Sequence, residues 1–364
     1  MTGGRILTAE DIEALAVGAW ILGTGGGGSP YLGLLNMRRL YAEGHRTELI
    51  APKTLADDDL IAVVSNMGAP LVGQERLTDS ETIARAVSLM ETHIGKRFKA
   101  TMALEIGGGN AIQPLMAAAH LGRPVVDADT MGRAYPEAQM TSVAVGNLQP
   151  YPLATVDCRG LESIVERVPS WKWMERISRK ACTEVGSIAA TCKAPRSGRE
   201  VKDHGILDTT TKAIRIGRLV REARRRHEDP IAALLEAEQG VLLFKGKVHD
   251  LQRRATEGFL RGRARIEGMD ADRGAAFDLE FQNEFAAGWR DGEVVVTTPD
   301  IICVMDSVSG EAIGTESIRY GQRVSVVALP APQLLLTPKG LEHVGPRAFG
   351  YDFDYRTAFQ VAAA

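Results

Sequence analysis

The chain lacks most of the motifs that assign a catalytic class directly. Its four cysteines form no CxxC pair and do not cluster with histidine, which excludes a zinc finger and predicts four free thiols. Its seven histidines form no HxH or HExxH arrangement, and the chain has no GxSxG. These absences speak against histidine-ligated zinc hydrolases and against hydrolases with a serine nucleophile.

An excess of basic residues and a long apolar run are also missing. Lysine and arginine number 43 against 46 acidic residues, a formal net charge of −3, whereas a nucleic-acid-binding surface requires a basic face. The longest apolar stretches are much shorter than the roughly 18 residues that a membrane span needs, and the N-terminus has no apolar signal core. We therefore expect a cytoplasmic protein that binds neither nucleic acid nor membrane.

The first part of the chain is predicted to be an α/β domain. Apolar runs at 60–65, 100–106 and 124–126 alternate with segments of helical pattern, which indicates a short parallel sheet with right-handed crossovers. A helix that starts near Thr8, a glycine loop at 23–30 and a second helix ending near residue 43 precede these strands. With 364 residues, 45% of them hydrophobic, the chain has enough material for a second domain.

The composition changes after residue 160 and again at Gly240. Residues 161–240 read as a helical connection, and residues 241–336 read as short alternating strands separated by turns, typical of a β-rich barrel or sandwich. The aromatic, turn-rich segment 337–364 is expected to pack back on the body. The predicted organisation is an α/β domain at 1–160, the helical connection, the β-rich domain and this tail.

Carboxylates end two successive predicted strands. Glu105 ends one strand, and Asp127 and Asp129 end the next, at the edge where α/β sheets bind their ligands. As oxygen ligands they suit a divalent metal ion of undetermined identity. As an acid/base pair, their like charges would raise one pKa. The structural alternative is that Asp127 or Asp129 only caps the next turn and pairs with Arg133.

The glycine loop is the second candidate element. Four glycines precede Ser29 and Pro30, which start a helix, so free amides and a helix dipole are placed to hold an anion or a polar ligand. The alternative is that the glycines only let two helices approach closely. Arg133 either binds a substrate carboxylate through two hydrogen bonds or forms an ion pair with Glu137. The predicted substrate-binding residues are Gly26, Gly27, Gly28, Ser29, Asn66, Asn110 and Arg133.

Four segments together resemble one known family. Residues 23–31 (GTGGGGSPY), 105–137, 298–324 and 345–355 (GPRAFGYDFDY) are similar to the bacterial family DUF917, named for S-methyl thiohydantoin desulfurase domains. The resemblance implies an α/β N-terminal region and a β-rich C-terminal region. It also implies desulfuration of thiohydantoin-type rings in one branch, with metal dependence, and a companion role beside hydantoin- or oxoproline-opening enzymes in others.

Two functions follow from the residues and the resemblance together. The first is hydrolysis of a small cyclic amide or thioamide, with Asp127 and Asp129 as metal ligands or base and Glu105 as third ligand or proton shuttle. The second is a non-catalytic subunit that binds a metabolite and partners a hydantoinase- or oxoprolinase-like enzyme. In either case we expect a small-molecule ligand and a homo-oligomer.

Overall fold

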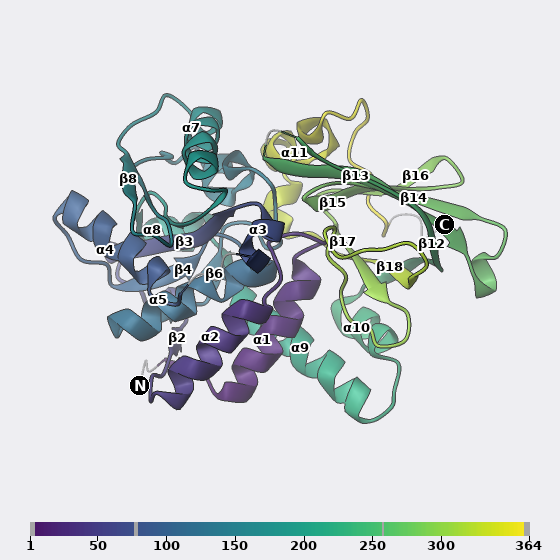
Figure 1. The fold of residues 1–364 in the computed structure, drawn as a ribbon, viewed down its shortest axis with the longest axis horizontal. Helices are drawn as coiled ribbons and strands as arrows, with labels where there is room; N and C mark the ends of the chain where they lie inside the picture. The colour runs from purple at the N-terminus through teal and green to yellow at the C-terminus, as the bar shows by residue number, and fades with distance from the viewer. Residues whose placement is uncertain (1–3, 76–78, 257, 360–364) are drawn as a thin grey trace.

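The computed structural model describes residues 4–75, 79–256 and 258–359. Two lobes lie side by side, each built on one large sheet (Figure 1). The first lobe is α/β and the second is an antiparallel β structure, which confirms the predicted fold class. Residues 360–364, the end of the predicted tail, lie outside the described residues.

The first sheet is mixed. Its strand order is β1-β2-β5-β4-β3-β9-β7-β8, with β10 paired to β3. The pairs β2–β5, β5–β4 and β4–β3 are parallel, as predicted for the short sheet. Antiparallel strands extend it on both sides, and β9 and β10 come from the segment predicted to be helical. The strands are β1 (Arg5–Ile6), β2 (Glu48–Ile50), β3 (Leu60–Gly68), β4 (Ala100–Ala103), β5 (Val125–Val126), β7 (Leu153–Val156), β8 (Glu162–Val165), β9 (Ile188–Cys192) and β10 (Arg196–Ser197).

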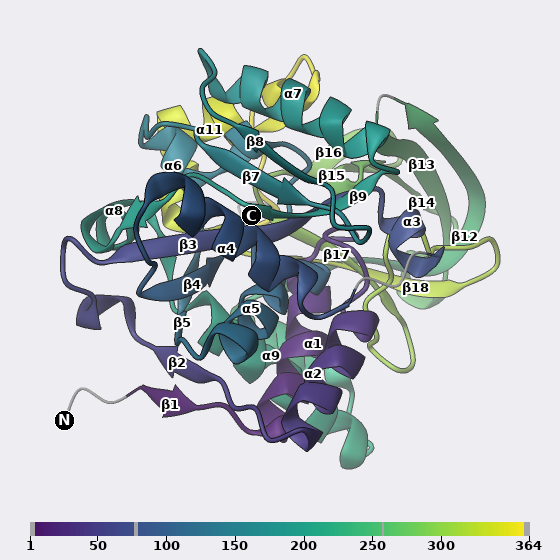
Figure 2. The same cartoon turned by 60° about the vertical axis from the view of Figure 1, so that its left-hand side comes forward.

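The central strand β3 is buried on both faces. Ala62 and Val64 belong to the core formed with helices α4 and α5, whereas Ile61 and Val63 belong to a second apolar cluster on the other face. This explains why its sequence is a continuous apolar run without alternation. Figure 2 shows α4 and α5 together on one side of the sheet and α7 along β7, β8 and β9. Both faces of β3 are therefore covered by apolar side chains.

Helix α1 starts at the predicted Thr8 cap, whereas α2 starts at Tyr31 with Pro30, and not the predicted Ser29, at its N-cap position. Thr8 accepts the amide of Asp11, and the Asp11 carboxylate accepts the amide of Thr8 at 2.8 Å, so α1 begins with a capping box. The helices are α1 (Ala9–Leu22), α2 (Tyr31–Ala42), α3 (Pro70–Glu75), α4 (Thr82–Ile94), α5 (Gln113–Leu121), α6 (Ser142–Val145), α7 (Trp171–Glu184), α8 (Gly198–His204), α9 (Thr209–Arg225), α10 (Pro230–Glu238) and α11 (Pro338–Val344). Short 3₁₀ turns occupy Pro52–Thr54, Gly108–Ala111, Ala138–Met140, Asp270–Asp272, Gln333–Leu336 and Pro346–Phe349.

Two glycines let α1 and α9 pack in direct backbone contact. A Cβ at Gly18 would lie 1.8 Å from the carbonyl oxygen of Ala213, and a Cβ at Gly217 would lie 1.8 Å from that of Ala14. The two helices run side by side beneath both lobes (Figure 1). Because any larger residue would separate them, these positions require glycine.

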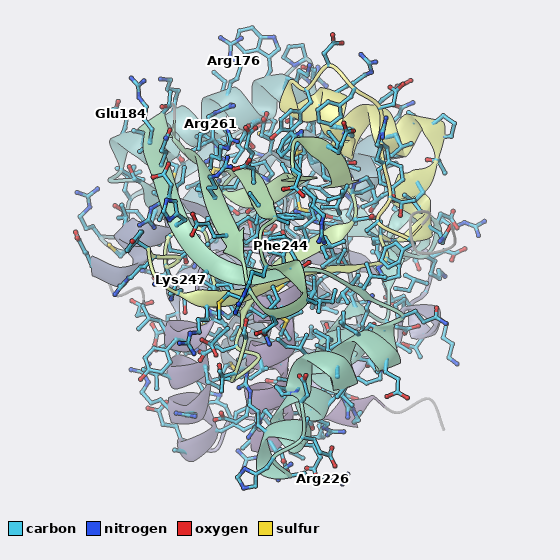
Figure 3. The ribbon with its side chains drawn as sticks, turned by 90° about the vertical axis from the view of Figure 1, so that its right-hand side faces the viewer. Arg176, Glu184, Arg226, Phe244, Lys247 and Arg261 are labelled. Atoms are coloured by element: carbon cyan, nitrogen blue, oxygen red, sulfur yellow. The ribbon has the colours of Figure 1, made fainter. Side chains whose placement is uncertain are left out.

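The second sheet is antiparallel and curled, in the order β16-β15-β14-β13-β12-β18-β17. Phe244 of β12 packs against Phe277 of β14 inside it, with ring centroids 5.3 Å apart, while Lys247 and Arg261 are exposed (Figure 3). The strands are β12 (Val241–Thr256), β13 (Phe259–Gly268), β14 (Ala276–Gln282), β15 (Glu284–Arg290), β16 (Glu293–Thr297), β17 (Ile301–Asp306) and β18 (Arg323–Leu329); a small ladder joins β6 (Ala128–Asp129) to β11 (Ile206–Leu207).

The C-terminal segment contacts the outside of this sheet. The Tyr351 hydroxyl donates to Glu280 at 3.1 Å, and Trp289 packs edge-on against Tyr351 and Phe353. Within the described part of the chain, every helix is too short or too polar to pass through a bilayer.

Candidate functional site

A cavity of about 440 Å³ lies where the two sheets meet. Its walls come from the glycine loop, the end of β3, the segment after β4, helix α7 and the start of β15. Its lining includes the apolar side chains of Met67, Met116 and Met131 together with carboxylates, amides and two cations. A concave space with a few convergent polar groups is the arrangement expected of a small-molecule site.

Glu105 enters the cavity from the segment that follows β4. Its Oε1 accepts the side-chain amide of Asn110 at 2.5 Å, and its Oε2 accepts the backbone amide of Tyr135 at 3.1 Å. Only 5% of the residue is exposed. The carboxylate is therefore held in a fixed orientation inside the protein.

Glu284 reaches the same cavity from the second sheet, at the first position of β15. Its Oε1 accepts the backbone amide of Gly27 at 3.3 Å, and its buried Oε2 has no hydrogen-bond partner among the described residues. A Cβ at Gly26 would lie 2.0 Å from this carboxylate, so the glycine loop can approach it only because no side chain intervenes. A buried carboxylate oxygen without a donor is costly to the fold and available to a ligand.

Burial raises the pKa of both carboxyls. It brings the pKa of Glu105 to about 7, against the opposing hydrogen bonds from Asn110 and Tyr135. Burial also holds the pKa of Glu284 well above its usual range, and the nearby Glu105 raises it further. Like charge between the two acids disfavours their joint ionisation, so ionisation of Glu105 favours the protonated form of Glu284.

Helix α7 and the residue after β9 supply the cations of the cavity. Arg179 forms an ion pair with Glu175, donates to the carbonyl of Pro136 at 2.9 Å and stacks on Phe259, so its guanidinium is fully engaged. Lys193 is 9% exposed, and burial lowers its pKa to about 8. The cavity therefore holds titratable groups of both signs near neutrality.

The structure brings several predicted residues together on this cavity. Glu105, Asn66 and Asn110 line it, and the Asn66 backbone amide donates to Asn110 Oδ1 at 2.7 Å. Gly27, Gly28 and Ser29 line it as well, whereas Gly26 does not. The glycine loop lies against the second sheet, since the Phe285 amide donates to the Thr24 carbonyl at 2.8 Å.

Asp127 and Asp129, which the sequence suggested as catalytic residues, lie outside the cavity lining. Asp127 accepts the backbone amide of Thr211 at 3.0 Å and also its hydroxyl, and so holds the first turn of α9. Asp129 Oδ2 accepts the amides of Ile106 at 2.8 Å, Met131 at 3.2 Å and Gly132 at 2.8 Å. Both carboxylates serve as acceptors for backbone amides of the turns around them, the structural alternative expected of strand-end aspartates.

The donor set does not fit the predicted metal site. Both oxygens of Asp127 and Oδ2 of Asp129 accept amide and hydroxyl donors from different elements, whereas the buried Oδ1 of Asp129 has no hydrogen-bond partner among the described residues. Among the residues that the structure describes, no three histidine, cysteine, aspartate or glutamate side chains are grouped so that they could share a metal ion. We therefore derive no step through a metal ion.

Arg133 is also absent from the cavity lining. Its fully buried guanidinium donates to the carbonyls of Ala134 at 3.1 Å, Asp300 at 2.6 Å and Phe285 at 3.0 Å, and to the Thr24 hydroxyl at 2.7 Å. It joins the glycine loop to the second sheet and does not face a ligand. The predicted pairing with Glu137 is likewise not formed; Glu137 instead accepts the side-chain amides of Gln139 and Gln282.

Sequence reasoning missed Glu284 and Lys193. Glu284 stands in the run FQNEFAAGW, where a carboxylate among apolar strand residues is a weak signal of a site. Lys193 follows the apolar run IAATC in the same way. Neither residue has a local motif, because the cavity is formed by segments that are distant in sequence.

The family of the chain is established by comparison with known proteins. The model of the S-Me-THD-like N-terminal domain matches residues 10–167, and that of the S-Me-THD-like C-terminal domain matches residues 169–358. The chain is 25% identical over 261 residues to a 5-oxoprolinase subunit from Chloroflexus aurantiacus, covering 64% of this chain and 94% of that protein. A crystal structure of a protein from Chromobacterium violaceum shares the fold, with a TM-score of 0.78 and 22% identity over 97% of this chain and all of the other.

Proposed function

The chain belongs to the S-Me-THD-like family, named for S-methyl thiohydantoin, and we propose that it hydrolyses a small cyclic amide or thioamide. The candidate substrates are rings of the hydantoin and thiohydantoin type. The 5-oxoprolinase subunit that the chain resembles is named for another small cyclic amide. Both names support the same class of substrate, and the cavity of about 440 Å³ has room for such a ring.

The observation that carries the proposal is the buried pair Glu105 and Glu284. Both line one cavity, and the pKa of each is raised by burial. In the proposed mechanism one member acts as the ionised general base and the other as the protonated general acid, and hydrolysis needs both. Hydrophobic walls and the glycine loop keep bulk water away from the pair.

In the proposed reaction the ionised carboxylate takes a proton from a water molecule as its oxygen bonds to the ring carbon. The electron pair of the ring C=S or C=O bond moves to the exocyclic atom. The protonated carboxyl then gives its proton to the leaving sulfur or ring nitrogen, and the bond to that atom breaks. When the ring nitrogen leaves, the electron pair on the exocyclic atom re-forms the double bond to carbon. When sulfur leaves, the added hydroxyl gives its remaining proton to the carboxylate and becomes the new C=O group. The amides of Gly28 and Ser29, which make no hydrogen bond within the described part of the chain, are placed to bind polar atoms of the ring.

Product analysis with matched variants tests this proposal. Purified protein is incubated with thiohydantoin, S-methyl thiohydantoin, hydantoin and 5-oxoproline, and sulfide, methanethiol and ring-opened acids are measured. We expect turnover of at least one ring, a loss of about 10²–10⁴-fold in kcat in Glu105→Gln and Glu284→Gln, and no change in the exposed control Glu293→Gln. Equal activity in all variants would remove the carboxylate pair from the reaction.

The name of the Chloroflexus relative favours a second candidate, because that protein is called a subunit. In this alternative the cavity binds a metabolite and a hydantoinase- or oxoprolinase-like partner performs the chemistry. Size measurement of the purified protein and a thermal-shift screen with the same rings separate the two candidates. Stabilisation by a ring without turnover, with and without added divalent metal, would favour this second candidate.

A further inference from the structure

Lys193 is a cation of the cavity that the proposed reaction has not used. It directly follows β9, and its backbone amide donates to the carbonyl of Val63 at 2.8 Å, so its main chain is fixed beside the central strand β3. Its side chain is 9% exposed and lines the cavity. A buried lysine at a ligand-sized cavity is held there at a cost in desolvation.

The charged groups around Lys193 are committed to other partners. From α7, Glu175 pairs with Arg179 and accepts the amide of Ala138 at 2.9 Å; from the segment after β4, Glu105 is held by its own hydrogen bonds. Cys182, also from α7, donates to the carbonyl of Met67. Among the described residues, no carboxylate lies within ion-pair distance of Lys193 Nζ.

We propose that Lys193 is a further catalytic residue of this cavity, whose ammonium stabilises the negative charge that develops on the exocyclic sulfur or oxygen of the ring. The inference rests on the proposed hydrolysis. A buried cation without a carboxylate in ion-pair distance interacts more strongly with a negative charge that appears during the reaction than with the neutral ground state. Arg179 is unsuited to this role because all three of its guanidinium nitrogens are engaged.

The step balances without any further reactant. As the water oxygen bonds to the ring carbon, the π electron pair of the C=S or C=O bond moves to the exocyclic atom, and the water proton passes to the carboxylate pair. Lys193 keeps its three protons and forms a charge-assisted hydrogen bond to the new anion. In ring opening the electron pair returns to the carbon as the ring nitrogen departs, and the contact weakens. In desulfuration the protonated sulfur leaves with its electron pair, and the added hydroxyl gives its remaining proton to the carboxylate as it forms the new C=O bond.

The role predicts the alkaline side of the pH profile. Burial is the main cause that lowers the pKa of Lys193 to about 8; Arg179 lowers it further, and Glu175, Cys182 and Glu105 oppose the shift. Below that pH the ammonium is present, and above it the amine is neutral and provides no charge. The rate is therefore expected to fall as pH rises through about 8.

The test compares Lys193→Met, Lys193→Arg and the exposed control Lys180→Met on α7 in the full chain, with the ring that the unmodified protein turns over. Steady-state kinetics are measured from pH 5.5 to 10, with thermal unfolding to verify folding. We expect Lys193→Met to lose about 10²–10³-fold in kcat with KM within about threefold, and to lose the alkaline limb. Lys193→Arg should regain part of kcat and move the limb to higher pH, because arginine stays charged.

Each outcome decides a different claim. If Lys193→Met keeps kcat within about threefold, or its loss is confined to KM, or the limb near pH 8 persists, the role of Lys193 is overturned while the hydrolase proposal stands. If the unmodified protein turns over no ring, the proposed function fails and the inference falls with it. Loss of activity in both Lys193 variants with a lowered unfolding temperature would assign Lys193 to the fold, and would also overturn it.

Discussion

Asn110 donates its side-chain amide to Glu105 across 2.5 Å and accepts the backbone amide of Asn66 at 2.7 Å with its side-chain oxygen. One residue thus connects the end of β3 to a carboxylate of the candidate acid/base pair. The hydrogen bond to Glu105 favours the ionised carboxylate and lowers its pKa, against the larger effect of burial. Asn110 therefore sets where in the pH range Glu105 loses its proton.

Replacing Asn110 by alanine should raise the pKa of Glu105 above about 7 and shift the acidic limb of the pH–rate profile to higher pH. The Asn66 amide also loses its acceptor, at a cost of about 1–3 kcal/mol in stability. Activity measured from pH 5 to 9 tests the shift, with Asn147→Ala as a control outside the cavity lining. An unchanged limb in a folded Asn110→Ala variant would contradict this role.

The raised pKa values of the pair predict how stability depends on pH. The folded protein holds protons on Glu105 and Glu284 more tightly than the unfolded chain, so this contribution is complete below about pH 4.5. The share of Glu105 is lost as pH rises through about 7, and the share of Glu284 is lost well above the usual titration range of a glutamate. Glu284→Gln should remove the share of Glu284, so its stability should fall less than that of the unmodified protein as pH rises from 5 to 8. It should therefore be more stable than the unmodified protein at pH 8.

Urea unfolding at pH 5, 6, 7 and 8 measures this difference. Other buried acids, such as Asp129 and Asp300, also have raised pKa values, so the informative quantity is the variant minus the unmodified protein at each pH. The exposed Glu293→Gln should show no such difference. Parallel stability curves for Glu284→Gln and the unmodified protein would show that Glu284 is ionised in the folded state.

Asp127→Asn should weaken the fold and spare the chemistry. Its carboxylate accepts two donors from Thr211 at the start of α9, and the amide of asparagine can replace only one of its acceptor oxygens. We expect a loss of about 1–2 kcal/mol in the free energy of unfolding, with kcat within about threefold of the unmodified protein. A loss of kcat as large as that of Glu284→Gln, with stability unchanged, would restore Asp127 to the site.

Arg133→Met should destabilise the junction of the two sheets. Four acceptors would lose their donor inside the protein, a change of about 3–5 kcal/mol for a buried, fully engaged cation. Arg133→Lys should restore little of the lost stability, because a single ammonium group cannot reach all the acceptors that the planar guanidinium group binds. Urea unfolding measures both, with the exposed Arg254→Met as the control.

Gly18→Ala and Gly217→Ala should each separate α1 from α9. The added methyl would lie 1.8 Å from a backbone oxygen of the other helix, and this clash outweighs the helix propensity of about 1 kcal/mol that alanine adds. We expect a net loss of at least about 1–3 kcal/mol in unfolding free energy. Gly33→Ala in α2 provides the comparison, because its nearest contact is a flexible side chain at 3.3 Å.

The sequence predicted the parts of the fold that local patterns specify. The apolar runs at 60–65 and 124–126 correspond to β3 and β5, and the helix predicted to start near Thr8 is α1. The antiparallel extension of the first sheet was missed because β7 and β9 are separated by a long helix, and their pairing depends on segments distant in sequence. Pairing of this kind leaves no periodic signal in either strand.

Only part of the candidate site could be predicted, because some of its residues come from segments that are distant in sequence. Glu105, Asn66 and Asn110 follow strands of one parallel sheet, where topology alone brings them together. Asp127 and Asp129 occupy equivalent positions, yet nearby turns present amides that their oxygens accept. Glu284 could not be foreseen, because its contact with the glycine loop depends on how the two sheets dock.

The separate origin of Glu105 and Glu284 has a consequence for biosynthesis. The two carboxylates are separated by 179 positions, since one is residue 105 and the other is residue 284. When only the first sheet has been synthesised, the chain contains Glu105 but not Glu284 or the part of the cavity wall that β15 supplies. The pair is complete only when β15 has been synthesised and docked, so under the proposed function a chain truncated before residue 284 should not turn over a ring.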